Sequence, residues 1–342
     1  MASTPSPHEI GPNPALRYRR FGPPLAVLGL EPQPLGALQE GKIRVAMRRA
    51  PINPSDLIPV TGAYRHRVAL PQTAGYEGVG VVTDAHGPWR HLLGRRVLPL
   101  RGPGTWCCEL DCDPRRAVPV PEAVADDMAA RAWINPMAAL SMLKRWPVAG
   151  KRLIVTAAAS SGARLLSRWA LDRGARSVTG ILRSGVHRTE LEALGLRVLE
   201  SSEHRRIDRA AAGADLIFDA VGGPLAERLL SHMPGDARMI CWGLLSGIPP
   251  RRPWRDGRLR HFHLRHTLEG LDAEAWQTGF SQLWTLLRDA PLPPCTDFAL
   301  TRWREALEYC ATPARSAKPM LVMSSPTQAT GAGANPAHPR DT

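Results

Sequence analysis

Apolar residues in the middle of the chain run in short blocks, and a helical pattern follows most of them. The first block, 153–155, passes into small residues and then into a segment with Leu165, Leu166, Trp169 and Ala170 on one side. Further apolar blocks lie at 177–182, 197–199, 216–220 and 238–242. Because strands that alternate with helices at this spacing form parallel sheets, the pattern predicts an α/β fold with a doubly wound parallel sheet.

The first third of the chain instead alternates polar and apolar residues over short runs, which is typical of half-buried strands. Residues 41–47 alternate in this way, and prolines and glycines separate them from the short runs at 75–82, 95–100 and 117–120. This pattern predicts a small irregular β-barrel. Near the end of the chain, a strand pattern at 297–300, a helix pattern at 303–309 and a strand pattern at 318–323 follow one another. We expect this segment to return to the barrel.

These patterns divide the 342 residues into two domains and two tails. We predict a barrel domain from residues 15–122 and 292–323, and a doubly wound domain from residues 123–291. The segments 1–14 and 324–342 are rich in proline and small residues, so we expect them to be disordered.

Two helices of the doubly wound domain have recognisable signals. Asn135 is predicted to cap a helix whose first residue is Pro136, and Pro147 is predicted to end it. Between Trp276 and Leu287, apolar residues recur at helical spacing, which predicts a helix packed on the core.

The turn after the first apolar block has the form of a dinucleotide-binding turn. Ala157, Ser160 and Ala163 stand where the glycines of such a turn fall, and Ser161 and Gly162 complete it. Small residues let the backbone approach a pyrophosphate, and the free N–H groups at the start of the helix face that anion. An ordinary strand, turn and helix of an α/β sheet is the alternative.

The end of the second apolar block predicts which dinucleotide is bound. Enzymes that use NAD place a carboxylate about 20 residues after the glycine turn. This chain has Arg183 and Ser184 there, and no carboxylate before Glu190. Arg183 can bind a 2′-phosphate through two hydrogen bonds, Ser184 can add another, and Arg188 is a candidate second cation. We therefore predict NADPH, although Arg183 could also be an ordinary surface arginine.

The chain is strongly basic, with 44 basic and 31 acidic residues and a net charge of +13. A basic surface attracts phosphates, acidic carrier proteins or nucleic acid. No segment resembles a nucleic-acid reading motif, so a partner rich in phosphate is favoured over nucleic acid, and an acidic acyl carrier protein is a further possible partner. A solvated, arginine-rich surface without a partner is the alternative.

Cysteine and histidine residues do not predict a metal site. Cys107, Cys108 and Cys112 lack paired spacing, and no carboxylate lies near the histidines at 261, 263 and 266. The six cysteines occur in a chain with no visible secretory signal and no apolar run of about 20 residues, the length that crosses a membrane. We therefore expect a reduced cytoplasmic protein with no membrane partner.

Short motifs along the chain carry a family resemblance. They are residues 50–56, 62–64, 71, 75–82, 104–106, 135–136, 218–223 and 318–320. Their order and spacing resemble the medium-chain dehydrogenase/reductase superfamily, and within it the mitochondrial-type 2-enoyl thioester reductases and their quinone-oxidoreductase-like relatives. The resemblance implies a GroES-like irregular β-barrel catalytic domain joined to a Rossmann nucleotide-binding domain. Zinc enzymes of this superfamily have a cysteine and a histidine where this chain has Asn53 and Tyr76, so the resemblance implies a zinc-independent enzyme.

The resemblance also implies roles for individual residues. Tyr64 matches the tyrosine that assists protonation in the enoyl thioester reductases. The other implied site residues are Asn53, Trp106 and Asn135 as pocket walls and orienting groups, Gly243 beside the cofactor, and Phe262, His263 and Leu264 in the acyl pocket.

Three functions are open at this point. The first is NADPH-dependent reduction of a 2-enoyl thioester of CoA or of acyl carrier protein. The second is reduction of a quinone or another activated alkene, and the third is binding without catalysis. The resemblance further implies a homodimer in which the fifth strand of the sheet, followed by the apolar segment 243–250, forms an edge that a second copy covers.

Overall fold

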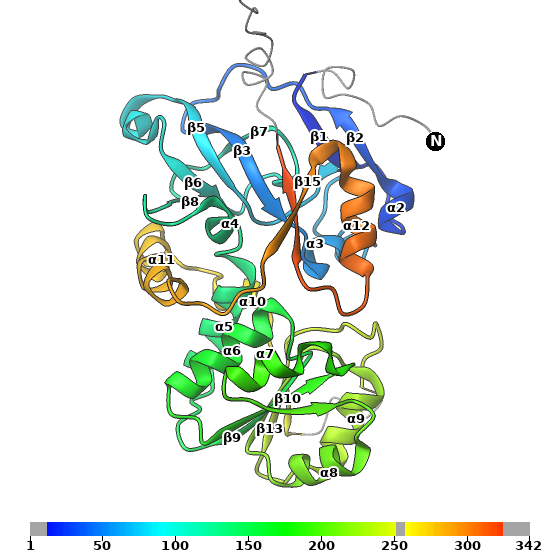
Figure 1. The fold of residues 1–342 in the computed structure, drawn as a ribbon. Helices are drawn as coiled ribbons and strands as arrows, with labels where there is room; N and C mark the ends of the chain where they lie inside the picture. Colours follow the sequence, from blue (N-terminus) through cyan, green and yellow to red (C-terminus); the bar gives the residue numbers. More distant parts are fainter. Residues whose placement is uncertain (1–11, 251–256, 324–342) are drawn as a thin grey trace, which may run out of the picture. The chain divides into compact units, whose positions relative to one another are not determined.

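The computed structural model describes residues 12–250 and 257–323, which form two compact units (Figure 1). The barrel unit comprises the described residues up to 131 together with 295–312 and 317–323, and the parallel-sheet unit comprises those of 132–294 and 313–316. The chain passes from the first unit to the second after Arg131 and returns after Pro294, whereas the sequence predicted these boundaries after residues 122 and 291. Of the expected tails, residues 1–11 and 324–342 lie outside the described residues.

The barrel unit begins earlier than the sequence indicated. Pro14 starts the first strand, and the side chain of Asn13 donates to the carbonyl oxygens of Gln33 and Glu109. Asn13 and Pro14 are therefore part of the folded unit and not of the tail to which the sequence assigned them.

The larger sheet of the barrel unit has seven strands in the order β15-β16-β3-β5-β6-β8, with β7 paired to β3. These strands are β3 (Ile43–Pro51), β5 (Val79–Ala85), β6 (Arg96–Pro99), β7 (Glu109–Cys112), β8 (Ala117–Pro119), β15 (Cys295–Ala299) and β16 (Lys318–Val322). A smaller sheet has the order β2-β1-β4, formed by β1 (Pro14–Tyr18), β2 (Leu28–Pro32) and β4 (Gln72–Thr73). The helices of this unit are α2 (Pro24–Val27), α3 (Pro54–Leu57), α4 (Asp126–Ala129) and α12 (Trp303–Ala311), with short 3-10 turns at Gly87–Leu92 and Leu300–Arg302.

Strand β3 shows why the alternation in the sequence was informative. Ile43, Val45 and Met47 are buried in the core of the barrel unit, and Arg44 between them is only half-buried. Side chains of successive strand residues point to opposite faces of a sheet, so the period of two in the sequence becomes one apolar and one polar face. The predicted strand at 41–47 is confirmed.

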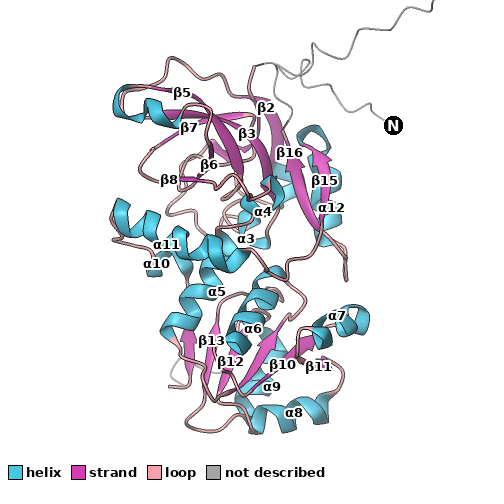
Figure 2. Ribbon diagram, turned by 60° about the vertical axis from the view of Figure 1, so that its left-hand side comes forward, coloured by secondary structure: helices cyan, strands magenta, loops and turns pink. Residues whose placement is uncertain are grey.

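The parallel-sheet unit contains six strands in the order β11-β10-β9-β12-β13-β14, all parallel (Figure 2). They are β9 (Arg152–Thr156), β10 (Ser177–Leu182), β11 (Arg197–Glu200), β12 (Leu216–Asp219), β13 (Arg238–Cys241) and β14 (Leu259–His261). The strand order reverses between β9 and β12, which is the position where doubly wound sheets bind ligands at the carboxyl ends of their strands. The predicted α/β fold with a doubly wound parallel sheet is confirmed.

Helices cover both faces of this sheet, with α8 and α9 on one face and α5, α6 and α7 on the other (Figures 1 and 2). The helices of the unit are α5 (Ile134–Arg145), α6 (Ser161–Asp172), α7 (Arg188–Ala193), α8 (His204–Ala212), α9 (Gly223–His232), α10 (Leu264–Thr267) and α11 (Ala273–Leu287), with a 3-10 turn at Gly185–His187. In α11, Trp276 and Phe280 are buried and lie against Trp133, which confirms the expected core packing of that helix. Within residues 12–250 and 257–323, no helix combines the length and the apolar character that a membrane crossing requires.

Two expectations for this unit were wrong. Helix α5 begins at Ile134 after Trp133, so Asn135 lies inside the first turn and does not cap it. Pro136 is tolerated there because the N–H groups of a first helical turn have no partner within the helix. The fifth strand, β13, is not an edge, because β14 pairs with it from Met239 to Cys241.

Candidate functional site

The turn between β9 and α6 adopts the backbone path expected of a dinucleotide-binding turn. Ala157 has a φ of +50°, a left-handed conformation that glycine adopts easily and that costs other residues about 1–2 kcal/mol. The hydroxyl of Ser160 caps α6 by accepting a hydrogen bond from the N–H of Ala163 at 3.4 Å. Ser161 and Gly162 form the first turn of this twelve-residue helix. Ala157 thus adopts the left-handed conformation that glycine adopts easily, and Ser160 supplies the cap of the helix.

Two side chains approach Gly162 at the start of α6. A Cβ atom added to Gly162 would lie 2.8 Å from Cη2 of Trp242 and 3.0 Å from Oδ1 of Asn135, so a larger residue there would require a neighbouring side chain to shift. The predicted residues Asn135 and Gly162 are therefore brought together. Trp242 was predicted as the last residue of the apolar block 238–242 but not as a site residue, although an aromatic residue at the end of a strand was a signal for one. Its indole N–H is shielded from solvent and has no hydrogen-bond partner among the described residues.

Gly243 lies beside the neighbouring strand end. A Cβ atom at this position would meet the carbonyl oxygen of Ala220 at 2.9 Å, so the backbones after β12 and β13 approach each other closely. The N–H groups of Leu245 and Ser246 then donate to the carbonyl oxygens of Ala220 and Val221, at 2.9 Å each. Gly243 thereby lies at the carboxyl edge of the sheet, and its place beside the cofactor stays a prediction.

A buried polar pair joins the two strands at which the sheet order reverses. Thr156 at the end of β9 donates its hydroxyl to Oδ1 of Asp219 at the end of β12, at 2.7 Å. Asp219 also accepts the N–H groups of Val221 and Gly222, at 3.2 and 2.9 Å. Burial raises the pKa of the Asp219 carboxyl, and these hydrogen bonds act in the opposite direction. Asp219 therefore fixes both the strand pair and the glycine turn that follows β12.

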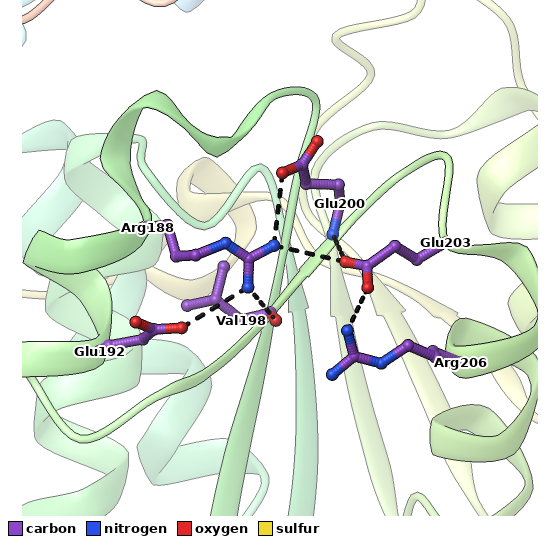
Figure 3. Close-up of polar contacts among 6 residues, drawn as sticks. All are labelled: Arg188, Glu192, Val198, Glu200, Glu203 and Arg206. Carbon is purple, nitrogen blue, oxygen red and sulfur yellow. Dashed lines mark hydrogen bonds and ion pairs between the residues drawn. The ribbon is translucent and has the colours of Figure 1, made fainter.

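The end of β10 presents a cation to solvent. Arg183 and Ser184 are exposed, and Arg183 has no hydrogen bond or ion pair with any residue of the described ranges. An unpaired guanidinium next to a hydroxyl is available for an anionic ligand. Arg188, predicted to be a second cation for this ligand, is instead bound to Val198 and to three glutamates (Figure 3). Because both of its terminal nitrogens are used within the protein, we do not place Arg188 in the anion site.

A buried polar cluster occupies the barrel unit around Asn53. The Asn53 amide donates to Oε1 of Glu77 at 2.7 Å, and its Oδ1 accepts from the Lys318 ammonium at 2.6 Å. Asp56 accepts the N–H groups of Asn53 and Tyr76, at 2.7 and 3.0 Å. Burial is the main cause that raises the pKa of the Asp56 carboxyl to about 7. Asn53 is only 2% exposed, so it orders this cluster and does not present its amide to solvent.

Tyr64 and Trp106, both expected at the substrate site, have different surroundings. Tyr64 is half-buried, Arg67 lies 5.9 Å from its ring centre, and its hydroxyl has no hydrogen-bond partner among the described residues. Trp106 is fully buried, and its indole N–H donates to the carbonyl oxygen of Pro51 at 3.2 Å. Trp106 therefore belongs to the core of the barrel unit, which corrects its predicted role as a wall of the substrate pocket.

The expected acyl-pocket residues also differ in exposure. Phe262 is buried and packs edge-on against Trp146. His263 is exposed and lies 5.3 Å from His266, ring centre to ring centre, and Leu264 is half-buried at the start of α10. Across the described ranges, no three His, Cys, Asp or Glu side chains are grouped so that they could hold a metal ion.

Comparisons with known proteins relate the chain to reductases. Residues 39–118 match the family model of the alcohol dehydrogenase GroES-like domain. The mitochondrial enoyl-[acyl-carrier-protein] reductase of Xenopus tropicalis is 28% identical over 338 residues, which cover 90% of this chain and 95% of that protein.

Two solved structures have a similar backbone. A protein from Bacillus thuringiensis, assigned as an NADPH:quinone reductase, is 30% identical with a TM-score of 0.82, over 91% of this chain and 98% of its own. The quinone oxidoreductase of Escherichia coli, solved with NADPH, has a TM-score of 0.78 over 90% of this chain and 99% of its own. At 20% identity, the second likeness concerns the fold alone.

Proposed function

Because this chain belongs to the medium-chain dehydrogenase/reductase superfamily and is an NADPH-dependent oxidoreductase, we propose that it reduces the double bond of a 2-enoyl thioester. The similarity to mitochondrial enoyl reductases over 90% of the chain supports this substrate class. The observation that carries the proposal is the hydroxyl of Tyr64, which no described residue uses for structure. The phenol is therefore available to a substrate.

The chain's own residues have separate tasks in this reaction. NADPH, when bound, supplies the hydride that adds to the β-carbon of the double bond. Negative charge develops on the thioester carbonyl oxygen, and Tyr64 stabilises it with a hydrogen bond and then gives its proton to the α-carbon. Arg183 and Ser184 would hold the 2′-phosphate of the cofactor, and the N–H groups at the start of α6, at Ser161 and Gly162, would bind its pyrophosphate.

An NADPH oxidation screen tests the substrate class. We expect turnover of crotonyl-CoA and of longer enoyl-CoAs, and little turnover of quinones. Turnover is measured as the loss of NADPH absorbance. Turnover of quinones alone would contradict the proposed substrate. Reduction of quinones or other activated alkenes is the second candidate, supported by the 30% identity to the Bacillus thuringiensis protein.

We also propose that the thioester is carried by an acidic carrier protein. The net charge of +13 supports this partner, because a basic surface steers an acidic protein toward its site. Salt screens such steering, so the advantage of a carrier-bound substrate over the CoA ester should shrink as ionic strength rises. An equal salt response for both substrates would count against the carrier.

Arg183→Ala is expected to weaken NADPH binding about ten- to a hundredfold and to leave NADH binding nearly unchanged. A charge-assisted hydrogen bond to the 2′-phosphate exists for NADPH alone, and hydrogen bonds to charged groups are the stronger class. Fluorescence titration of both cofactors measures the two dissociation constants.

Arg197→Ala is the matched control for this titration. Arg197 is also an exposed arginine, but it starts β11 and so lies at the opposite end of the sheet from Arg183. Its removal should change neither affinity by more than about twofold. Equal losses for NADPH and NADH in the Arg183 variant would overturn the phosphate assignment.

The reaction is expected to need no metal. Asn53 stands where zinc relatives have a cysteine, and its oxygen already accepts a hydrogen bond from the Lys318 ammonium, whose positive charge opposes a cation there. Dialysis against a chelator should leave both the unfolding midpoint and NADPH oxidation unchanged. Zinc bound at one equivalent and lost together with activity would contradict this expectation.

A further inference from the structure

Arg188 holds together three elements of the parallel-sheet unit that meet near the end of β10. Its guanidinium donates to the carbonyl oxygen of Val198 at 3.0 Å and pairs with Glu192, Glu200 and Glu203 at 3.3–3.5 Å (Figure 3). Glu203 also pairs with Arg206 and accepts the N–H of Glu200 at 2.6 Å. Both terminal nitrogens of Arg188 are therefore bound within the protein.

This network lies beside the residues assigned to the 2′-phosphate. Strands β10 and β11 pair in register, with Leu182 opposite Glu200, and the N–H of Ser201 donates to the carbonyl oxygen of Leu182 at 2.7 Å. Arg183 and Ser184 are the next residues after Leu182. Glu200 thus stands one strand away from the phosphate-binding segment, a spacing of about 4.8 Å between backbones.

The side chain of Glu200 reaches toward that same segment. A Cβ atom added to Gly185 would lie 2.6 Å from Oε1 of Glu200, so the carboxylate rests against the backbone that follows Ser184. Oε1 is also the atom that Arg188 binds, at 3.3 Å. The carboxylate that approaches the phosphate-binding segment is therefore the one that Arg188 neutralises.

The charges of the network make this neutralisation necessary. Three carboxylates face two guanidiniums, those of Arg188 and Arg206, and without Arg188 the three would face one. A phosphate monoester carries about −1.5 to −2 charges near neutral pH, so an unpaired carboxylate at this distance repels it. NADH has no such phosphate and feels little of this repulsion.

We propose that Arg188 is a positioning residue that gives the enzyme its preference for NADPH without touching the cofactor. It holds and neutralises Glu200, so that Arg183 and Ser184 can receive the 2′-phosphate. The inference rests on the NADPH site proposed above and is independent of the thioester substrate. It also explains how a carboxylate can stand beside a 2′-phosphate site, where carboxylates ordinarily select NADH.

Binding of two nucleotide fragments tests this role in the full-length protein. The probes are 2′,5′-ADP, which has the 2′-phosphate, and ADP, which lacks it. Arg188→Met, which keeps the apolar stem, should weaken binding of 2′,5′-ADP about tenfold and of ADP less than twofold. The double variant Arg188→Met with Glu200→Gln should recover the affinity for 2′,5′-ADP to within about twofold, because the repelling charge is gone.

Each outcome decides between the roles of Arg188. Equal losses of affinity for both probes would mean that Arg188 only supports the fold. A loss of affinity for 2′,5′-ADP that Glu200→Gln does not recover would mean that Arg188 contacts the phosphate directly. Either result overturns the proposal. If the methionine variant unfolds, Arg188→Gln carries the same expectation, since it keeps hydrogen bonding and removes the charge. If the unmodified protein does not prefer 2′,5′-ADP to ADP, the proposed NADPH site itself fails.

Discussion

Tyr64→Phe should lower kcat for enoyl thioesters about 10²–10⁴-fold, with little change in the dissociation constant of NADPH. The variant loses one hydroxyl that has no partner among the described residues, and it keeps the ring beside Arg67. The fold should therefore be unaffected, while the proton donor and the hydrogen bond to the developing oxyanion are both lost. Steady-state NADPH oxidation with crotonyl-CoA measures the effect.

Tyr309→Phe is the matched control for this measurement. Tyr309 is also a half-buried tyrosine of the barrel unit, and its ring packs against Phe298 at 5.6 Å between ring centres. Its substitution should leave kcat within about twofold of the unmodified protein. If Tyr64→Phe also leaves turnover unchanged, Tyr64 has no part in the mechanism, and quinone reduction becomes the better explanation because it needs no dedicated proton donor.

Asp219→Ala should lower the free energy of unfolding by more than about 3 kcal/mol. The substitution leaves two buried donors, the hydroxyl of Thr156 and the N–H of Gly222, and one partly buried donor, the N–H of Val221, without an acceptor. Each unsatisfied buried group costs about 1–3 kcal/mol. Urea unfolding followed by circular dichroism measures the loss.

Asp219→Asn separates the hydrogen bonds of this residue from one another. The amide oxygen can still accept hydrogen bonds from Thr156 and Val221. The amide nitrogen would face the N–H of Gly222 and cannot accept from it, so this one hydrogen bond is lost. We expect a cost of about 1–3 kcal/mol, clearly smaller than that of alanine. If the free energy of unfolding of the alanine variant lies within about 1 kcal/mol of that of the unmodified protein, Asp219 does not fix the strand ends.

Helices and strands were predictable from the sequence where several of their residues are buried, because buried residues form an apolar pattern in the sequence. Strand β10 was predicted with its observed bounds, 177–182, because five of its six residues are buried and apolar or small. Strands β1, β2, β4, β7 and β14 were missed. Strands β4 and β14 have only two and three residues, and they become strands through partners far away in the sequence. Helix α8 was missed because only Ile207 and Ala211 of its nine residues are buried.

The same distinction applies to the candidate sites. The turn at Ala157 and Ser160 was predictable because its chemistry lies within one continuous segment. The contact of Trp242 with Gly162 depends on how two distant segments meet, and sequence spacing does not report that. Arg188 was assigned to the cofactor for the same reason, since Glu200 and Glu203 lie beside it only after β11 has paired with β10.

The short strand β14 determines what a second copy of the chain would meet at this end of the parallel sheet. It is the last described strand of the sheet, and Arg260 and His261 on it are exposed. In an isologous pair whose two-fold axis passes through the middle of β14, Arg260 faces its own copy, so such a homodimer would bring two Arg260 side chains together. Like charges directly opposite one another destabilise a strand pair, and dissolved ions weaken that repulsion. Such a homodimer would therefore associate more tightly in concentrated salt than in dilute buffer.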